Sequence, residues 1–333
     1  MATDGPPRAL LVAPRFFGYE REIREQMVRD GWAVDMLPDR PFDAAALKAL
    51  ARVAPALTAP QANRFYASEV QRLGAARYDL ILVIQGECVF KPTLRLLRTA
   101  FPAARHVFYT WDSLTNKPAS RGRLPMYDEC FTFDEVDAAN LGIRFRPLFF
   151  TPGFEREAAP APAYDISFVG TIHSDRYAIV KAIQAQLRDP ARAYWYLYLQ
   201  APWMFAARKL FTRTIAGATR PEFRFAPLPT ARVQDIFLAS RAVLDIEHPA
   251  QRGLTMRTIE ALGSQTKLVT TNAAVAACDF FDRENIAIID RRDPGLPPGF
   301  LATPFRPVPA AVHERYRLRT WVREVCGTPP AAS

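Results

Sequence analysis

Short apolar runs alternate with amphipathic stretches along the first half of the chain, a pattern that predicts strands and helices in turn. The opening shows it most clearly: residues 8–13 are apolar, 20–30 carry apolar side chains at helical spacing, and 33–37 are apolar again. This β-α-β succession has the length of a Rossmann unit with parallel strands. Further strands are expected at 79–84, 106–111, 130–133 and 145–149, and further helices at 61–75, 93–99 and 134–141.

The alternation stops at residues 151–163, which are rich in Pro and small side chains, and then restarts. Such a stretch is typical of a stiff linker between domains. Strands are then expected at 165–169, 194–199, 223–226, 242–246, 267–271 and 286–289, and helices at 175–187, 203–215, 231–239, 254–263, 277–283 and 313–325. We therefore predict an α/β protein with two Rossmann-like domains, 1–150 and 164–312, and an interdomain cleft for a ligand.

Composition narrows the classes of function. With 333 residues, 49% hydrophobic and 23% charged, the chain can form two cores and is not expected to be disordered. The formal net charge of +9 suits a nucleotide diphosphate, an anionic membrane or a nucleic acid as partner. The Arg residues are dispersed, and no basic stripe carries interleaved aromatic residues, so nucleic-acid binding is not expected.

The cysteines and the first residues indicate a compartment. The four cysteines form no C-x-x-C pair, which excludes zinc ribbons and redox motifs and favours reduced thiols: Cys88, Cys130, Cys278 and Cys326. The N-terminus lacks the apolar region of a signal peptide, and no apolar run approaches the ~20 residues of a membrane span. A cytoplasmic protein, at most peripheral to a membrane, is expected.

The segment from Asp245 to Gly263 carries the strongest signal for a binding site. A strand should end near Asp245, and a helix should begin near Gly253. One arc of that helix is suited to pack on the sheet, while the opposite arc presents Arg257 and Glu260 one turn apart, on a solvated face if they form only an ordinary ion pair. Arg257 and the free N–H groups at the helix start can bind a diphosphate, and Glu260 can accept hydrogen bonds from a ribose. The alternative is an ordinary Arg257–Glu260 ion pair.

A second glycine turn is expected where the strand at 165–169 meets the next helix. Gly170 and Thr171 would let a phosphate or a sugar approach the backbone closely, with Arg176 as the counter-charge. An ordinary β-α turn is the alternative interpretation of these three residues.

Three segments resemble those of bacterial GT-B-type glycosyltransferases: Phe168-Val-Gly-Thr171, the stretch from His248 to Glu260, and Lys267-Leu-Val-Thr-Thr-Asn272. The resemblance is strongest to proteins of lipopolysaccharide or capsule biosynthesis related to the CgeB spore-maturation group, and segments 108–113 and 131–134 extend it into the first half. It implies that the first domain binds the acceptor, that the second binds a nucleotide-sugar, and that a last helix, 313–326, rejoins the first domain.

For the site, the resemblance implies that Arg257 contacts the diphosphate and Glu260 the ribose of a UDP- or GDP-sugar. This donor is a substrate, and neither a cofactor nor a metal is expected. The sequence departs from the usual pattern at 248–252, where a second Glu or a Gly-rich turn is normal, so His248 is either a sugar contact or a packing residue. The expected donor set is Gly170, Thr171, Arg176, His248, Gly253, Leu254, Thr255, Arg257 and Glu260.

Candidate catalytic bases come from the first domain, because an inverting transferase needs a base near the acceptor hydroxyl. Glu20, Glu87 and Asp112 each lie just past an expected strand or in the loop that follows it. We favour Asp112, since Trp111 beside it is a natural platform for a sugar. Each of the three can instead be a helix cap or a turn residue, and a retaining mechanism needs no such base.

Residues 203–214 are amphipathic and basic. Such a helix can lie on the anionic inner surface of a membrane and meet a lipid-linked acceptor, or it can pack on its own sheet with a basic edge in solvent. Taken together, these patterns predict a glycosyltransferase of cell-surface polysaccharide biosynthesis with a glycan or a lipid-linked acceptor. The alternative is a non-catalytic nucleotide-sugar-binding protein of the same fold.

Overall fold

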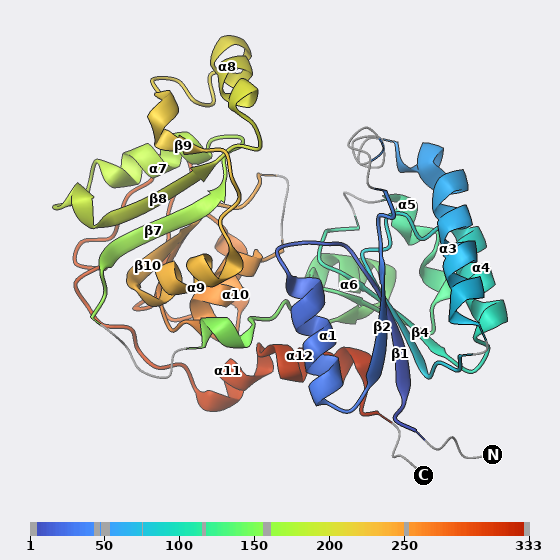
Figure 1. Cartoon of the computed structure of the whole chain (residues 1–333). Helices are drawn as coiled ribbons and strands as arrows, with labels where there is room; N and C mark the ends of the chain where they lie inside the picture. Colours follow the sequence, from blue (N-terminus) through green and yellow to red (C-terminus); the bar gives the residue numbers. More distant parts are fainter. Residues whose placement is uncertain are drawn as a thin grey trace. The chain divides into compact units, whose positions relative to one another are not determined.

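The chain forms two compact units in a computed structural model that describes residues 5–42, 47, 54–74, 76–114, 118–155, 161–249 and 253–329. Unit 1 comprises Met1–Pro147 and Leu318–Ser333, and unit 2 comprises Leu148–Arg317. Residues 156–160 of the expected linker lie outside the described residues. Each unit contains one six-stranded sheet in which every pair of neighbouring strands is parallel (Figure 1).

Unit 1 is a doubly wound sheet with the strand order β2-β1-β3-β4-β5-β6. In chain order its elements are β1 (Arg8–Ala13), α1 (Tyr19–Arg29), β2 (Ala33–Pro38), η1 (Pro55–Thr58), α3 (Ala59–Leu73), β3 (Leu80–Ile84), α4 (Lys91–Ala100), β4 (Arg105–Thr110), α5 (Pro118–Arg121), η2 (Leu124–Met126), β5 (Glu129–Thr132), α6 (Glu135–Leu141), β6 (Arg144–Phe145) and α12 (Leu318–Cys326). The chain passes from β1 outward to β2 and then crosses to β3 on the other side of β1. The winding therefore reverses between β1 and β3.

Helices cover both faces of the unit 1 sheet: α1 and α12 lie side by side on one face, and α3 and α4 lie on the other (Figure 1). The central strand β3 is therefore buried along its whole length, as its unbroken apolar sequence requires. On the α12 side, the indole of Trp321 is 0% exposed and packs edge-on against the ring of Tyr109, with centroids 4.7 Å apart. The last helix of the chain thus supplies part of the core of unit 1.

Unit 2 has the strand order β12-β11-β10-β7-β8-β9, so its first strand, β7, lies in the middle. Its elements are η3 (Pro152–Phe154), β7 (Tyr164–Thr171), α7 (Arg176–Gln184), η4 (Pro190–Arg192), β8 (Ala193–Tyr198), α8 (Pro202–Phe211), η5 (Arg220–Glu222), β9 (Phe223–Arg224), α9 (Thr230–Leu238), β10 (Ser240–Asp245), α10 (Met256–Gly263), β11 (Lys267–Thr270), η6 (Ala273–Ala277), β12 (Ile286–Ile288) and α11 (Ala310–Arg315). The winding reverses between β7 and β10, which is where ligands of such sheets bind. The predicted α/β class with two Rossmann-like sheets is confirmed.

Two predicted helices are wrong. The single helix expected over 313–325 is two helices, α11 and α12, because the backbone at Arg317 forms a parallel bridge with Phe150 instead of continuing the helix. The helix expected over 277–283 is absent: the short 3₁₀ segment η6 ends at Ala277, and turns follow it. There the side chain of Asp282 accepts the N–H of Glu284 at 2.8 Å, a local hydrogen bond that competes with a helix.

The buried indole on α12 gives a test of the fold. We expect Trp321→Ala to lower the free energy of unfolding by about 3–5 kcal/mol, because it empties a large buried volume. Trp203→Ala is the matched control, since Trp203 is 69% exposed and its loss should cost less than about 0.5 kcal/mol. Urea unfolding followed by circular dichroism measures both, and equal losses would contradict the placement of α12 in the core.

Candidate functional site

The strands on either side of the winding reversal in unit 2 end in polar or glycine residues. β7 ends in Gly170 and Thr171, β10 ends in Asp245, and β11 ends in Thr270. Because the strands are parallel, these carboxyl ends meet at one edge of the sheet. The site predicted from the sequence falls at this edge.

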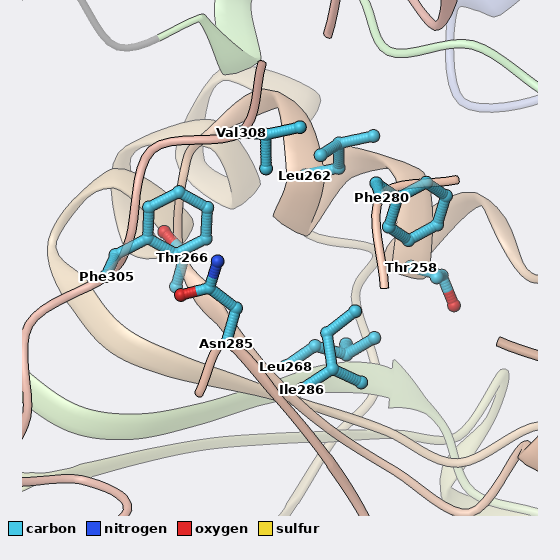
Figure 2. A pocket seen from close by; sticks show the side chains of 9 residues that line it. All are labelled: Thr258, Leu262, Thr266, Leu268, Phe280, Asn285, Ile286, Phe305 and Val308. Atoms are coloured by element: carbon cyan, nitrogen blue, oxygen red, sulfur yellow. The ribbon is translucent and has the colours of Figure 1, made fainter. Parts of the chain in front are cut away.

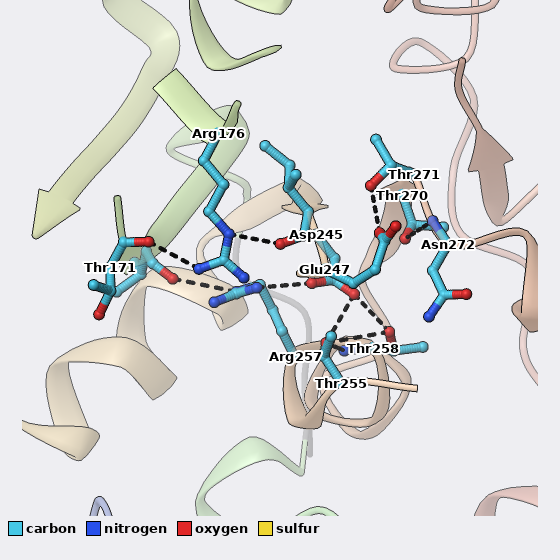
Figure 3. A network of polar contacts seen from close by, with 12 residues as sticks. Thr171, Arg176, Asp245, Glu247, Thr255, Arg257, Thr258, Thr270, Thr271 and Asn272 are labelled. Atoms are coloured by element: carbon cyan, nitrogen blue, oxygen red, sulfur yellow. Dashed lines mark hydrogen bonds and ion pairs between the residues drawn. The ribbon is translucent and has the colours of Figure 1, made fainter. Parts of the chain in front are cut away.

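A buried carboxylate organises the edge (Figure 3). Asp245 is 0% exposed, and its Oδ1 lies 2.7 Å from Nη1 of Arg257. Its Oδ2 accepts hydrogen bonds from the hydroxyls of Thr255 at 2.8 Å and Thr258 at 2.7 Å. Three donors from α10 and its cap therefore compensate the burial of one negative charge.

Helix α10 begins later than the sequence predicts. Thr255 is the N-cap of α10, with its hydroxyl accepting the N–H of Thr258 at 3.3 Å, so Gly253 and Leu254 lie in the preceding loop. Threonine suits this position because its side chain satisfies a free N–H of the first turn. The carbonyl of Gly253 accepts a hydrogen bond from the amide of Asn272 at 3.2 Å. Residues 250–252 of this loop lie outside the described residues.

The alternative interpretation, an ordinary Arg257–Glu260 ion pair on a solvated face of α10, is wrong. Glu260 is only 6% exposed, and Ser264 at the end of the same arc is 0% exposed. The reason is a second layer behind the helix: η3 contacts α10, and a Cβ on Gly263 would lie 2.5 Å from the ring of Phe150. A helix packed on both sides buries both arcs.

Gly170 provides space for Arg257. A Cβ at Gly170 would lie 2.9 Å from Nη2 of Arg257 and 3.1 Å from the ring of Phe168. Arg257 also donates from Nε to the carbonyl of Val169 at 3.2 Å, and its side chain is 15% exposed. The end of β7 at Gly170 and helix α10 are distant in sequence, and they therefore meet at this guanidinium.

Arg176 is a second, more deeply buried cation at the same edge. It is 8% exposed, and it donates to the carbonyl of Ile246 at 2.7 Å and to that of Thr171 at 2.8 Å (Figure 3). No carboxylate within the described ranges forms an ion pair with it. Burial and the positive charge of Arg257 lower the pKa of Arg176. Asp245 and Glu247 act in the opposite direction and raise that pKa, but of the two guanidinium groups only Arg257 forms a direct ion pair with a carboxylate, Asp245, in the described part of the chain.

Two imidazoles lie beside these cations. The rings of His173 and His248 are 5.2 Å apart, and His248 is exposed. Burial, together with the charge of Arg176, lowers the pKa of His173 to about 3, so that ring is neutral at pH 7. The edge therefore combines two guanidinium groups with a neutral imidazole, groups that can donate hydrogen bonds to an anion.

A further ion-pair network lies next to the predicted set. Arg291 contacts Asp175 at 2.6 Å and Glu247 at 2.6 Å, and the hydroxyl of Thr271 donates to Glu247. The sequence analysis missed Arg291 and Glu247 and treated Asp245 only as a strand end. The sequence did contain an indication: carboxylates stand at the end of the apolar strand that finishes at Asp245. A carboxylate that is buried there needs a hydrogen-bond donor.

Hollows in unit 2 lie elsewhere. A cavity of about 10 Å³, enough for about one water, lies against α10 beside the sheet (Figure 2) and is lined by Thr258, Leu262, Thr266, Leu268, Phe280, Asn285, Ile286, Phe305 and Val308. A larger hollow of about 290 Å³ is lined by Glu155, Gln265, Val308, Ala310, His313, Glu314 and Arg317. Gln265 precedes β11, which places this hollow toward the amino ends of the strands. Neither hollow contains the two arginines.

The three candidate bases in unit 1 differ in exposure. Glu20 is 4% exposed and accepts the N–H of Phe16 at 3.1 Å, while the side chain of Glu87 is 9% exposed and lies 2.5 Å from Arg40. Asp112 is exposed, and its Oδ2 accepts a hydrogen bond from Gln85 at 2.6 Å. Of the three, Asp112 thus has the carboxylate that is open to a ligand. Among the described residues, no group of three or more His, Cys, Asp or Glu side chains could hold a metal ion.

No known protein family and no curated protein matches the chain by sequence. Solved structures match its fold over nearly its whole length. The chain is similar to HepE from Anabaena in complex with UDP and glucose (TM-score 0.61, 12% identity, 97% of this chain and 99% of that chain). It is also similar to sucrose-phosphate synthase from Thermosynechococcus elongatus (TM-score 0.55, 12% identity, 96% and 94%) and to MurG from Acinetobacter baumannii (TM-score 0.51, 12% identity, 96% and 99%). These likenesses confirm the predicted GT-B fold.

The buried carboxylate can be tested without a ligand. Asp245→Asn should lower the free energy of unfolding by about 3 kcal/mol at pH 7, because it leaves Arg257 without its charged partner. Asp235→Asn is the control: it breaks a 2.9 Å pair with Arg232 whose side chains are 60% and 63% exposed, and it should cost at most about 0.5 kcal/mol. Chemical denaturation compares the two variants, and similar small losses would show that Asp245 does not organise the edge.

Proposed function

We propose that the chain is a glycosyltransferase that binds the diphosphate of a nucleotide-sugar at the carboxyl edge of the unit 2 sheet. The observation that carries the proposal is the pair Arg176 and Arg257, held together at the point where the winding of the sheet reverses. A diphosphate would supply the negative charge that this pair lacks, since only Asp245 forms a direct ion pair with it in the described part of the chain.

The helix start adds to this attraction. α10 begins at Met256, just after the Thr255 cap, and its first turn carries the positive end of the helix dipole. Arg257 belongs to that first turn, so the dipole and the guanidinium act on the same region. In the reaction, the acceptor hydroxyl attacks the anomeric carbon and the bond from that carbon to the diphosphate oxygen breaks. The negative charge that develops on the leaving diphosphate is what these cations would stabilise.

Two further donor contacts belong to the proposal. Glu260 would accept hydrogen bonds from the ribose, and the exposed His248 at the rim would contact the transferred sugar. UDP is the nucleotide we favour, because the similar HepE structure is a complex with UDP and glucose. For an inverting reaction we propose Asp112 of unit 1 as the base, because its carboxylate is exposed, while Glu20 is buried against the N–H of Phe16 and Glu87 is ion-paired.

Nucleotide binding tests the donor site. Isothermal titration with UDP, GDP and their glucose conjugates should show binding by at least one of them, with UDP favoured. Arg176→Lys and Arg257→Lys keep the charge but lose the planar fork, so each should weaken binding about tenfold, or about 1.4 kcal/mol. Arg232→Lys is the control, because Arg232 lies on α9 in an exposed pair.

Two outcomes would count against parts of the proposal. Failure of every nucleotide to bind, or equal affinities in all three variants, would refute the donor site. Binding without transfer to any acceptor of a glycan panel would instead identify a non-catalytic nucleotide-sugar-binding protein.

For α8 we propose contact with an anionic membrane surface that carries the acceptor. The helix projects from the rest of unit 2 (Figure 1), and Trp203, Leu210 and Phe211 are 69%, 76% and 79% exposed. Only Phe205 of this helix is buried, so most of the apolar surface of α8 does not pack on the sheet. Arg208 and Lys209 flank the apolar side chains and suit anionic head groups. Among the described residues, no helix is both long and apolar enough to span a bilayer.

Vesicle sedimentation tests this contact. The chain should bind vesicles that contain about a third phosphatidylserine more tightly than neutral ones, and Leu210→Glu with Phe211→Glu should reduce that binding at least tenfold, because it removes buried apolar area and adds repulsion. Leu57→Glu is the control, since Leu57 in unit 1 is also 69% exposed. Equal loss in the control, or no preference for anionic vesicles, would argue against α8 as the contact.

A further inference from the structure

Unit 1 has its own winding reversal, between β1 and β3, and the loops that leave these two strands carry unusual backbone. Phe17 in the first loop has φ 50, and Gln85 in the second has φ 66. Side chains other than glycine rarely adopt such left-handed angles, and holding them there costs roughly 1–2 kcal/mol per residue. Strained residues of this kind concentrate at sites where function requires them.

The first loop presents an aromatic surface. Phe16 and Phe17 are 43% and 56% exposed, and their rings pack edge to face with centroids 4.6 Å apart. The ring of Phe16 also lies 6.0 Å from that of Trp111, which follows β4 at the same edge of the sheet. Core packing does not account for two exposed phenyl rings on a strained loop.

The second loop fixes a carboxylate beside these rings. Gln85 is 7% exposed, and its Oε1 accepts the hydroxyl of Thr110 at 2.8 Å and the N–H of Trp111 at 3.2 Å. A backbone N–H can only donate, so this contact defines which end of the amide is the oxygen. The Nε2 of Gln85 therefore donates to Oδ2 of Asp112 at 2.6 Å. The exposed carboxylate is held in place directly after Trp111.

From this arrangement we infer that Phe16, Phe17, Trp111 and Asp112 form a subsite for a pyranose ring. The C–H face of a pyranose packs on aromatic rings, while its hydroxyl groups donate to a fixed carboxylate. A lipid chain would match the rings, but it would place hydrocarbon beside a carboxylate to which it can donate no hydrogen bond, which is costly. The subsite thus fits a glycan end, in contrast to α8, where apolar side chains are flanked by cations.

This inference deepens the proposed function, because it identifies the sugar-binding part of the acceptor. It assigns Gln85 as a positioning residue, which acts on the sugar through Asp112. Glycoside binding to unit 1 does not require a nucleotide, however, so the subsite can be tested separately from the donor site.

The experiment is saturation-transfer NMR on the full chain, with methyl α- and β-glycosides of the common hexoses and their disaccharides as probes, with and without UDP. At least one glycoside should receive saturation, and Phe17→Ala and Trp111→Ala should weaken its binding at least tenfold. UDP affinity should stay within twofold of wild type. Phe145→Ala is the matched control, because Phe145 is a 37% exposed aromatic on β6 of the same unit, and it should bind like wild type.

A glycine substitution at Phe17 distinguishes a role of the ring in sugar binding from a role in folding. Phe17→Gly relieves the left-handed strain, so it should raise the melting temperature while it weakens glycoside binding as much as Phe17→Ala does. A ring with a structural role would instead lower the melting temperature when removed. Gln85→Glu should weaken glycoside binding as well, because a second carboxylate would repel Asp112 and displace it.

The outcomes separate the two proposals. Glycoside binding that is absent, or that all variants retain, overturns the subsite even if UDP binds normally. Glycoside binding that depends on Phe17 and Trp111 in a chain that binds no nucleotide supports the subsite and refutes the donor site. Loss of vesicle binding in Phe17→Ala without any effect on glycosides would assign the rings to a lipid and overturn the pyranose assignment.

Discussion

The pairing of buried Asp245 with Arg257 is the interaction on which the unit 2 site depends. One carboxylate with no exposed surface holds the guanidinium and both threonines at the start of α10, so it fixes the helix cap and the direction of Arg257 together. The missing Cβ of Gly170 follows from this geometry, because the guanidinium occupies the space that a side chain would need. A buried charge is costly without donors, and here the donors are also the parts of the site.

Arg176 adds to that arrangement a positive charge with no direct carboxylate partner in the described part of the chain. Its guanidinium is bound by two backbone carbonyls, which orient it without neutralising it, and Arg257 lies close enough to lower its pKa. Asp245 and Glu247 oppose this shift, but their direct ion pairs are with Arg257 and Arg291. Under the proposed function, the diphosphate would supply the direct anionic partner that Arg176 lacks among the described residues.

The sequence was sufficient to place the strands and to bring Gly170, Arg176 and Arg257 to one edge, because apolar runs define parallel strands whose carboxyl ends must meet. It was not sufficient for contacts set by distant segments. The burial of Glu260 depends on η3 and Phe150, the helix break near Tyr316 depends on a bridge to Phe150, and Arg291 meets Glu247 from 44 residues away. Helical periodicity describes one helix in isolation, and it cannot show a second layer that covers the other face.

The two sheets share a topology that reverses at an internal strand pair, yet their edges have opposite chemistry. Unit 2 gathers cations beside a helix start, whereas unit 1 gathers aromatic rings beside the Asp112 carboxylate. In both units the energetic cost lies at residues that follow the strands. In unit 2 it is charge repulsion between Arg176 and Arg257, and in unit 1 it is the left-handed backbone at Phe17 and Gln85. Beneath these edges β3 is fully buried and apolar, and β1 and β10 are buried along most of their length. Under the proposed function, the cationic edge would bind the anionic donor and the aromatic edge would bind the neutral glycan, each on a rigid sheet that holds its side chains in place.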